Sequence, residues 1–125
     1  MNAKDGRKQT GNAAEAAAAR YLESRGVRIV DRNVFSRGGE IDLIGMDRDV
    51  LVFFEVRFRG QGSYSSGAES ISQRKQQRLV RAASFYIHRH NLWQRDARID
   101  VIAMAPGALR KYRIQWIKNA IQADP

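Results

Sequence analysis

The hydrophobic positions of this chain recur with a helical period in two stretches. Small apolar residues three and four positions apart over 14–22 predict a first helix, capped by Asn12 and ended at Gly26. A similar stripe predicts a second helix over 70–90. The side chains expected to face the core are Ala14, Ala17, Ala18, Tyr21 and Leu22 in the first helix, and Ile71, Leu79, Ala83, Tyr86 and Ile87 in the second.

Segments rich in β-branched and aromatic residues predict five strands. The expected order is one helix, three strands, a helix and two strands, which is typical of an α/β fold with a mixed sheet flanked by helices. At 125 residues and 43% hydrophobic content, the chain suits a single domain over 11–125. A polar, aperiodic N-terminal arm over 1–10 is expected to be flexible. The predicted strands span 27–34, 39–46, 50–58, 98–104 and 112–117.

The second and third strands are predicted to form a β-hairpin. If its loop is the two residues Arg48 and Asp49, opposite positions have residue numbers that sum to 97. The apolar face supports this register, because a slip of one residue would expose it. One face then pairs Asp42 with Glu55, Glu40 with Arg57 and Ile44 with Phe53, and the other face pairs Ile41 with Val56 and Leu43 with Phe54.

The pair Asp42 and Glu55 carries the main chemical signal of the sequence. Two carboxylates directly opposite each other repel unless a proton, a basic group or a cation lies between them. Hard divalent cations such as Mg²⁺ or Mn²⁺ take oxygen ligands of this kind, so the pair predicts a metal site that could activate water against a phosphodiester. The alternative is a solvated strand face on which Glu40 pairs with Arg57 and Arg59 neutralises the rest.

The charge balance favours a polyanionic partner. The chain has 22 Lys and Arg against 13 Asp and Glu, a net charge of +9, so nucleic acid is the expected ligand. Arg74, Arg78 and Arg81 recur at helical spacing, which suits contact with a phosphate backbone. A solvated basic face that only keeps the protein soluble is the alternative. Trp93 and Trp116 are interpreted as packing residues rather than platforms for bases.

Two further features concern the cellular compartment. The chain has no cysteine, which gives no sign of a disulfide framework or a thiolate metal site. Its apolar runs are far shorter than a membrane span, and its polar start does not resemble a signal peptide. We therefore expect a cytoplasmic protein without a membrane partner.

Three segments resemble the YraN-like family of endonuclease-like bacterial proteins. They are Gly11 to Glu15, GGEIDLI over 38–44 and VFFEVRFR over 52–59, and the Lys75 helix and the RIDVIAM strand extend the resemblance to residues 11–105. This family looks like a member of the PD-(D/E)xK nuclease superfamily and is similar in motif style to archaeal Holliday-junction resolvases. The resemblance implies a restriction-endonuclease-like core and hydrolysis of DNA, including branched DNA, with Mg²⁺ or Mn²⁺. Because such resolvases act as dimers, it also allows a homodimer.

The resemblance implies a role for each matching residue. It makes Asp42 and Glu55 the metal ligands, with Glu15 as a supporting carboxylate. Arg57 stands where the family motif has lysine; arginine can stabilise charge at a phosphate but cannot act as a general base. Gln73 or Lys75 would orient the nucleophile, and Lys75 could supply the missing amine, although a solvated helix residue is the favoured interpretation. The expected nucleic-acid contacts are Arg37, Arg59, Arg74, Arg78 and Arg81.

Three functions therefore follow from the sequence. The first is a metal-dependent nuclease or nuclease-like protein that acts on DNA. The second is a catalytically disabled nucleic-acid-binding module of the same fold, because Arg57 replaces the expected lysine. The third is a protein-interaction domain without a nucleic-acid role, which would show no salt-sensitive binding to DNA.

Overall fold

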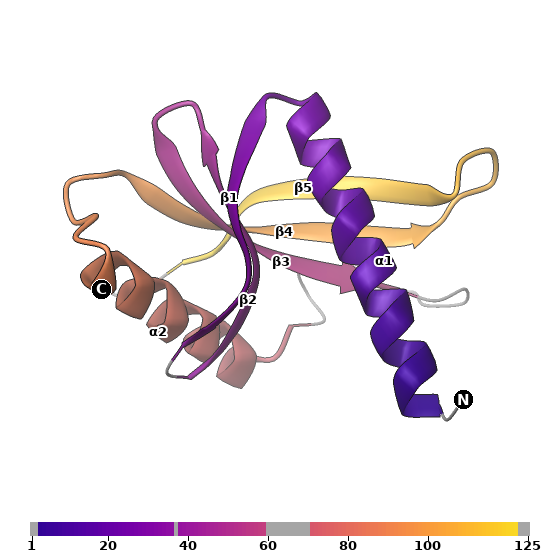
Figure 1. Ribbon diagram of the computed structural model, residues 1–125, viewed down its shortest axis with the longest axis horizontal. Coiled ribbons are helices and arrows are strands. Elements are labelled where there is room, and N and C mark those ends of the chain that lie inside the picture. The colour runs from indigo at the N-terminus through magenta and orange to yellow at the C-terminus, as the bar shows by residue number, and fades with distance from the viewer. Residues whose placement is uncertain (1–2, 37, 60–70, 123–125) are drawn as a thin grey trace.

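In a computed structural model, the chain forms a five-stranded mixed sheet with one helix packed on each face (Figure 1). The structure describes residues 3–36, 38–59 and 71–122, and for residues 3–11 the backbone alone. Strand order follows the chain, and all neighbours are antiparallel except β3 and β4. The predicted α/β class and element order are confirmed. The elements are α1 (Ala3–Ser24), β1 (Val27–Ser36), β2 (Gly39–Asp47), β3 (Val50–Phe58), α2 (Gln73–Arg89), β4 (Ala97–Pro106) and β5 (Tyr112–Ile121).

Helix α1 begins earlier than expected. It starts at Ala3 instead of Asn12, so the proposed capping residue lies inside the helix. Once a helix is nucleated, each added residue gains a hydrogen bond, and this outweighs the cost of Gly6 and Gly11, about 1 kcal/mol each. The backbone at the expected arm is therefore helical from Ala3 onward, while the flexibility of 1–10 stays a prediction. The helix ends as predicted before Gly26, which has a φ of +92°.

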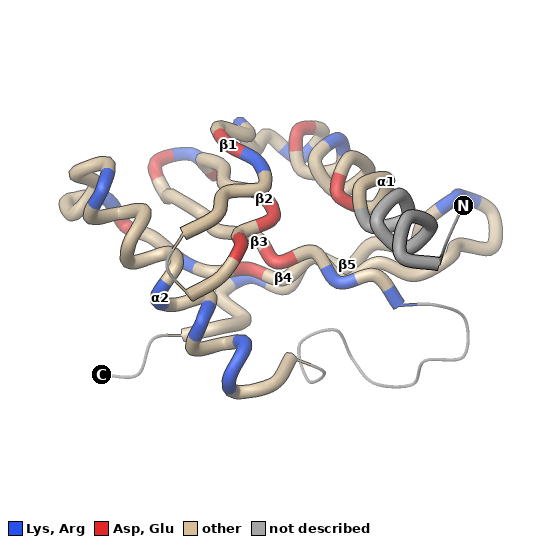
Figure 2. The backbone as a smooth tube through the Cα atoms, turned by 60° about the horizontal axis from the view of Figure 1, so that its bottom comes forward, with Lys and Arg blue, Asp and Glu red and all other residues tan. Residues whose placement is uncertain are grey.

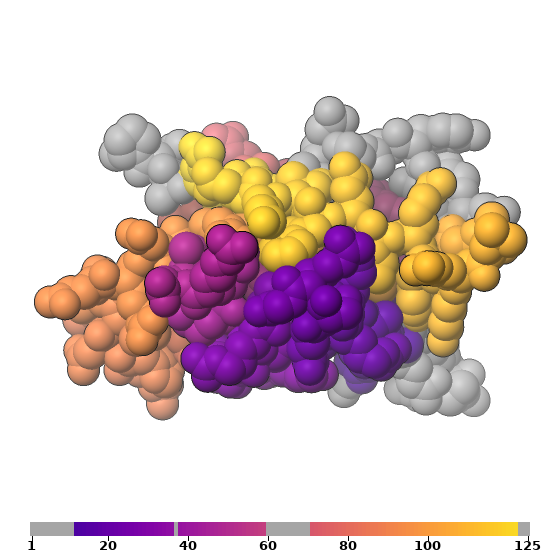
Figure 3. Space-filling model, turned by 90° about the horizontal axis from the view of Figure 1, so that it is seen from above, coloured from indigo at the N-terminus to yellow at the C-terminus, as the bar shows by residue number. Residues whose placement is uncertain are grey.

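The two faces of the sheet bury separate cores. On the α1 face, small alanines of the helix let it approach Leu43, Phe54 and Ile102 closely. Figure 3 shows α1 in indigo beside the yellow strand β5, whose side chains border this core. On the α2 face, Leu79 and Tyr86 pack with other residues against the sheet. The predicted core residues of both helices are buried or partly buried.

No described helix is long and apolar enough to cross a membrane.

The hairpin of β2 and β3 has the predicted register. Leu43 pairs with Phe54 and Asp47 with Val50, so the two-residue loop is confirmed. The ladder ends at Leu43, however, and Ile41 packs in the α2-side core instead of the α1 side. The predicted continuous face is wrong at this position.

A left-handed residue of β1 lies beside this change of side. Asn33 has a φ of +50° and faces Asp42, between the regular pairs Arg32–Leu43 and Val34–Ile41. A left-handed residue breaks the regular pleat, so that the positions beyond it need not keep the alternation of side-chain directions. Asparagine tolerates this conformation better than most residues. Asn33 thus lies next to the point where the pairing of β2 with β3 ends.

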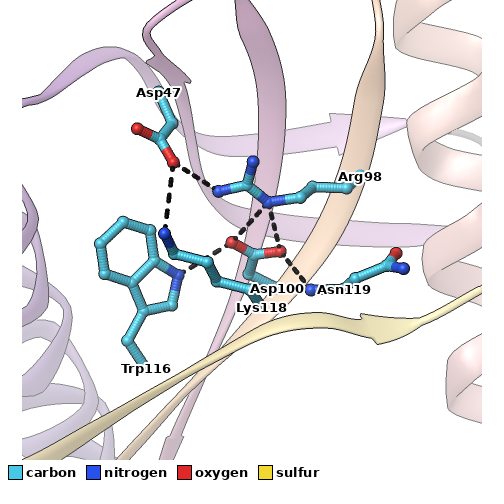
Figure 4. Close-up of polar contacts among 6 residues, drawn as sticks. All are labelled: Asp47, Arg98, Asp100, Trp116, Lys118 and Asn119. Carbon is cyan, nitrogen blue, oxygen red and sulfur yellow. Dashed lines mark hydrogen bonds and ion pairs between the residues drawn. The ribbon is translucent and has the colours of Figure 1, made fainter.

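A polar network joins β2, β4 and β5 (Figure 4). Asp100 is fully buried and accepts hydrogen bonds from Arg98 Nε, at 3.0 and 3.1 Å, and from Trp116 Nε1 and Asn119 N, each at 2.8 Å. Arg98 Nη2 also donates to Asp47 Oδ2 at 2.6 Å. The buried charge is thus paired and hydrogen-bonded, which is the condition under which a buried carboxylate is tolerated.

The two tryptophans differ in their surroundings. Trp116 is half-buried and lies 6.2 Å from Phe54 between ring centroids, which confirms its interpretation as a packing residue. Trp93 is 62% exposed, so the same interpretation is wrong for it. Trp93 lies on the connection between α2 and β4, and its ring makes an edge-to-face contact with that of His88, with 5.5 Å between the centroids.

Candidate metal centre and active site

A cavity of about 290 Å³ opens where β2 separates from β3. It gathers acidic and basic side chains from both helices and from two strands, and Figure 2 shows the acidic positions of α1, β2 and β3 near one another. Polar groups that converge on one cavity are the usual mark of a binding site. The cavity is lined by Ala14, Glu15, Asp42, Glu55, Val56, Arg57, Phe58, Arg59 and Lys75.

Asp42 lies at the point where the ladder ends. Its Oδ2 accepts a hydrogen bond from Val56 N at 2.8 Å, so the side chain takes the bond that a backbone carbonyl would make in a continued sheet. The predicted meeting of Asp42 and Glu55 is therefore right, but it occurs between the side chains beyond the end of the ladder.

The surroundings of Asp42 raise its pKa from 3.8 to about 8. Burial is the largest cause, followed by the charge of Glu55; the hydrogen bond from Val56 N lowers the pKa, and the charge of Glu15 and a hydrogen bond with Glu55 raise it. At neutral pH and without a cation, Asp42 therefore holds a proton. A divalent cation would replace that proton and relieve the repulsion.

Glu15 and Glu40 complete an acidic cluster with Asp42. One oxygen from each lies within 4.8 Å of the others. Ligands on opposite sides of one ion are at most two metal–oxygen distances apart, about 4.2 Å for Mg²⁺ and up to about 5 Å for Ca²⁺. The spacing and the all-oxygen donor set therefore fit a hard divalent cation after a small closure.

Asn33 holds two of these carboxylates in place. Its Nδ2 donates to Glu15 Oε2 at 2.9 Å and to Glu40 Oε1 at 3.1 Å. Sequence reasoning missed Asn33 and assigned Glu40 only to the strand face. Asparagine is disfavoured in strands, so its occurrence among β-branched residues was the one local signal at Asn33. That signal does not show which residues Asn33 contacts, because its partners are distant in sequence.

Lys75 forms an ion pair with the buried Glu55. Its Nζ lies 2.8 Å from Glu55 Oε1, and the Glu55 side chain is 4% exposed. Ser72 caps α2 and accepts a hydrogen bond from Lys75 N at 3.1 Å, so the first turn of the helix carries the amine to the cavity. The Lys75 side chain is 44% exposed, so it is partly solvated as expected, but its amine is paired with Glu55 instead of being free in solvent.

The remaining predicted residues divide into two groups. Arg57 and Arg59 line the cavity, and among the described residues Arg59 Nε and Nη2 are buried without a hydrogen-bond partner. Gln73 lines a different cavity and is not brought to the acidic cluster. Arg37 lies outside the described residues. Arg74, Arg78 and Arg81 are exposed along α2.

Together, the fold and the cavity define an α/β domain with a carboxylate cluster that could hold a divalent cation. Residues 14–104 match the family described as "Uncharacterised protein family UPF0102". The chain belongs to this family, which confirms the family resemblance of its motifs.

Similar proteins cover nearly the whole chain. A UPF0102 protein of Marinobacter nauticus is 65% identical over 98% of this chain and 99% of its own length. Those of Alcanivorax borkumensis and Stutzerimonas stutzeri are 43% and 39% identical, over 94% and 91% of this chain and 95% of their own lengths. The aligned regions therefore cover most of both helices and most of the five strands.

Proposed function

We propose that this protein is a metal-dependent nuclease that hydrolyses phosphodiester bonds in DNA. The observation that carries the proposal is the convergence of Asp42, Glu55, Lys75 and Arg59 on one cavity. Half-buried carboxylates destabilise a fold unless they are compensated. An arrangement that keeps several of them beside basic side chains is therefore typical of a functional site.

Asp42 and Glu55 would hold Mg²⁺ or Mn²⁺, with Glu15 and Glu40 as the flanking carboxylates. Such a cation polarises a phosphoryl oxygen and lowers the pKa of a water molecule bound to it. The hydrogen bonds from Val56 N to Asp42 and from Asn33 to Glu15 and Glu40 orient the carboxylates in advance.

Lys75 supplies the amine that the strand motif lacks at Arg57. An ammonium group has three donors, and the ion pair with Glu55 occupies one of them. The remaining N–H groups can stabilise negative charge that develops on a phosphate in the cavity.

Arg59 is the proposed contact for a phosphate. The Nε and Nη2 atoms form one edge of the guanidinium, and this edge matches the two oxygens of a phosphate in a bidentate pair. A buried donor without a partner is unfavourable, and an anion that enters the cavity would satisfy both atoms.

The test is cleavage of labelled duplex, single-stranded and branched DNA with Mn²⁺ by wild type and point variants. Wild type is expected to cut, and Glu55→Gln and Lys75→Met are expected to lower the rate by at least about 100-fold, the usual size of an electrostatic contribution to catalysis. Lys111→Met is the matched control, because Lys111 is exposed and does not line the cavity.

The other outcomes decide between the remaining functions. If Arg57→Lys is the only variant that cleaves DNA, the natural protein is a nucleic-acid-binding module with a disabled site. Binding of DNA by all variants without any cleavage would refute the nuclease. Absence of salt-sensitive DNA binding would refute both and favour a protein-interaction domain.

A further inference from the structure

The exposed side of α2 carries a stripe of two kinds of side chain. Arg74, Arg78, Arg81, Phe85 and His88 are all exposed. At about 100° per residue, they fall within an arc of about 80° on the helix. The stripe is basic in its first half and aromatic in its second.

The aromatic half borders a hollow of about 580 Å³. Phe85 is 39% exposed and Trp93 is 62% exposed, and both line this hollow together with His88 and Arg81. Exposed aromatic rings that gather around one hollow mark a candidate interaction site, unlike single exposed apolar residues. The hollow also lies within the size range of pockets that take small, flat ligands.

We propose that this surface, the α2 track of Arg74, Arg78, Arg81, Phe85, His88 and Trp93, binds single-stranded nucleic acid. The arginines would contact successive phosphates, and the aromatic rings would stack on bases. Bases that are already stacked in a duplex cannot offer their faces to such rings, whereas an unpaired strand can.

The charge of the helix selects this ligand over a second copy of the chain. Helix α2 contains no Asp or Glu, and Figure 2 shows basic positions repeated along it. Two copies that met through the same surface would place like charges opposite each other. A lipid surface is also disfavoured, because the apolar side of α2, with Leu79, Ala83 and Tyr86, is already buried against the sheet.

The length of the track sets the expected size of the ligand. From Arg74 to His88 the helix rises about 21 Å, which spans at most about six phosphates at the 3.4 Å per nucleotide of a stacked duplex strand, and fewer in an extended unpaired strand. The basic end of the track adjoins Lys75, whose Nζ contacts Glu55. A bound strand would therefore run toward the acidic cavity, a consequence that matters only together with the proposed function.

The experiment measures binding of fluorescein-labelled thymidine oligonucleotides of four, eight and twelve nucleotides in EDTA, with a duplex for comparison. Single strands of eight nucleotides or more are expected to bind more tightly than the duplex and to quench tryptophan emission. The quenching should disappear in Trp93→Phe, which keeps Trp116. Trp93→Ala and Phe85→Ala should each weaken binding about tenfold, the usual effect of losing one stacked base.

A test variant and its control address the basic half of the track, and a second control addresses the aromatic half. Arg78→Ala is expected to flatten the salt dependence by about 0.7 in logarithmic slope, and Arg113→Ala, an exposed arginine of β5, should leave the affinity unchanged. Phe35→Ala serves as the aromatic control, because Phe35 is 76% exposed and does not line the hollow.

Three results would overturn the proposal: equal or tighter binding of the duplex, unchanged binding by the aromatic variants, or quenching of Trp93 by anionic vesicles but not by oligonucleotides. The binding assay contains no metal, so its outcome does not depend on whether the protein is a nuclease.

Discussion

Asp42→Asn is expected to stabilise the metal-free protein at high pH. In the folded chain Asp42 keeps its proton up to a pH of about 8, whereas its ordinary pKa is 3.8. Between these values the folded state binds more protons than the unfolded state. The contribution of Asp42 to the free energy of unfolding therefore falls as the pH rises from about 4 to about 8, and this contribution is constant outside the window.

The structure gives the size of this effect. A pKa difference between 3.8 and about 8 corresponds to about 6 kcal/mol at 1.36 kcal/mol for each pH unit. We assign about half of it to Asp42, because Glu55 shares the repulsion and the side chains can move apart. Asparagine keeps an oxygen for Val56 N and removes the charge. We therefore expect Asp42→Asn to gain about 3 kcal/mol at pH 8.5, or roughly 10 °C in Tm.

Thermal unfolding in EDTA from pH 4 to pH 9, followed by circular dichroism, tests this expectation. The Tm of wild type should decline across the window relative to that of Asp42→Asn, and Mn²⁺ should restore wild type but not the variant. Asp49→Asn, in the exposed hairpin loop, is the control. The reasoning fails if wild type and Asp42→Asn have parallel profiles, or if the variant is less stable at pH 8.5.

Three other predictions follow from the same contacts. The affinity for Mn²⁺, measured by titration calorimetry, should rise with pH up to about 8, because the cation must displace the proton of Asp42; a flat profile would contradict this. Asn33→Ala should weaken Mn²⁺ binding by about 10- to 100-fold, because Glu15 and Glu40 lose the amide that orients them, and unchanged affinity would exclude that role. Asp100→Asn should lower the free energy of unfolding by about 3 kcal/mol in urea without affecting Mn²⁺ affinity, because it removes the buried charge that pairs with Arg98 Nε and leaves only Asp47 to neutralise that guanidinium; a loss below 1 kcal/mol would show that the network is not needed for stability.

Local patterns in the sequence were sufficient for the framework of this protein. The period of two in the strands and the two-residue loop at Arg48 determine the hairpin register, because a slip by one residue would turn an apolar face to solvent. The helical period likewise determines which sides of α1 and α2 are buried. Asp42 and Glu55 follow directly from that register, so their proximity could be predicted.

Tertiary structure decided how the site is completed. Ile41 packs in the other core, and the neighbouring Asn33 of β1 connects Glu15 with Glu40. The docking of α2 delivers Lys75 to Glu55, 20 positions away in the sequence, and leaves Trp93 exposed. These contacts depend on where whole elements pack against each other, and short-range periodicity contains no information about that placement. The sequence by itself therefore determined the strands, their register and the first carboxylate pair, whereas only long-range packing decided which amide, amine and aromatic residues accompany them.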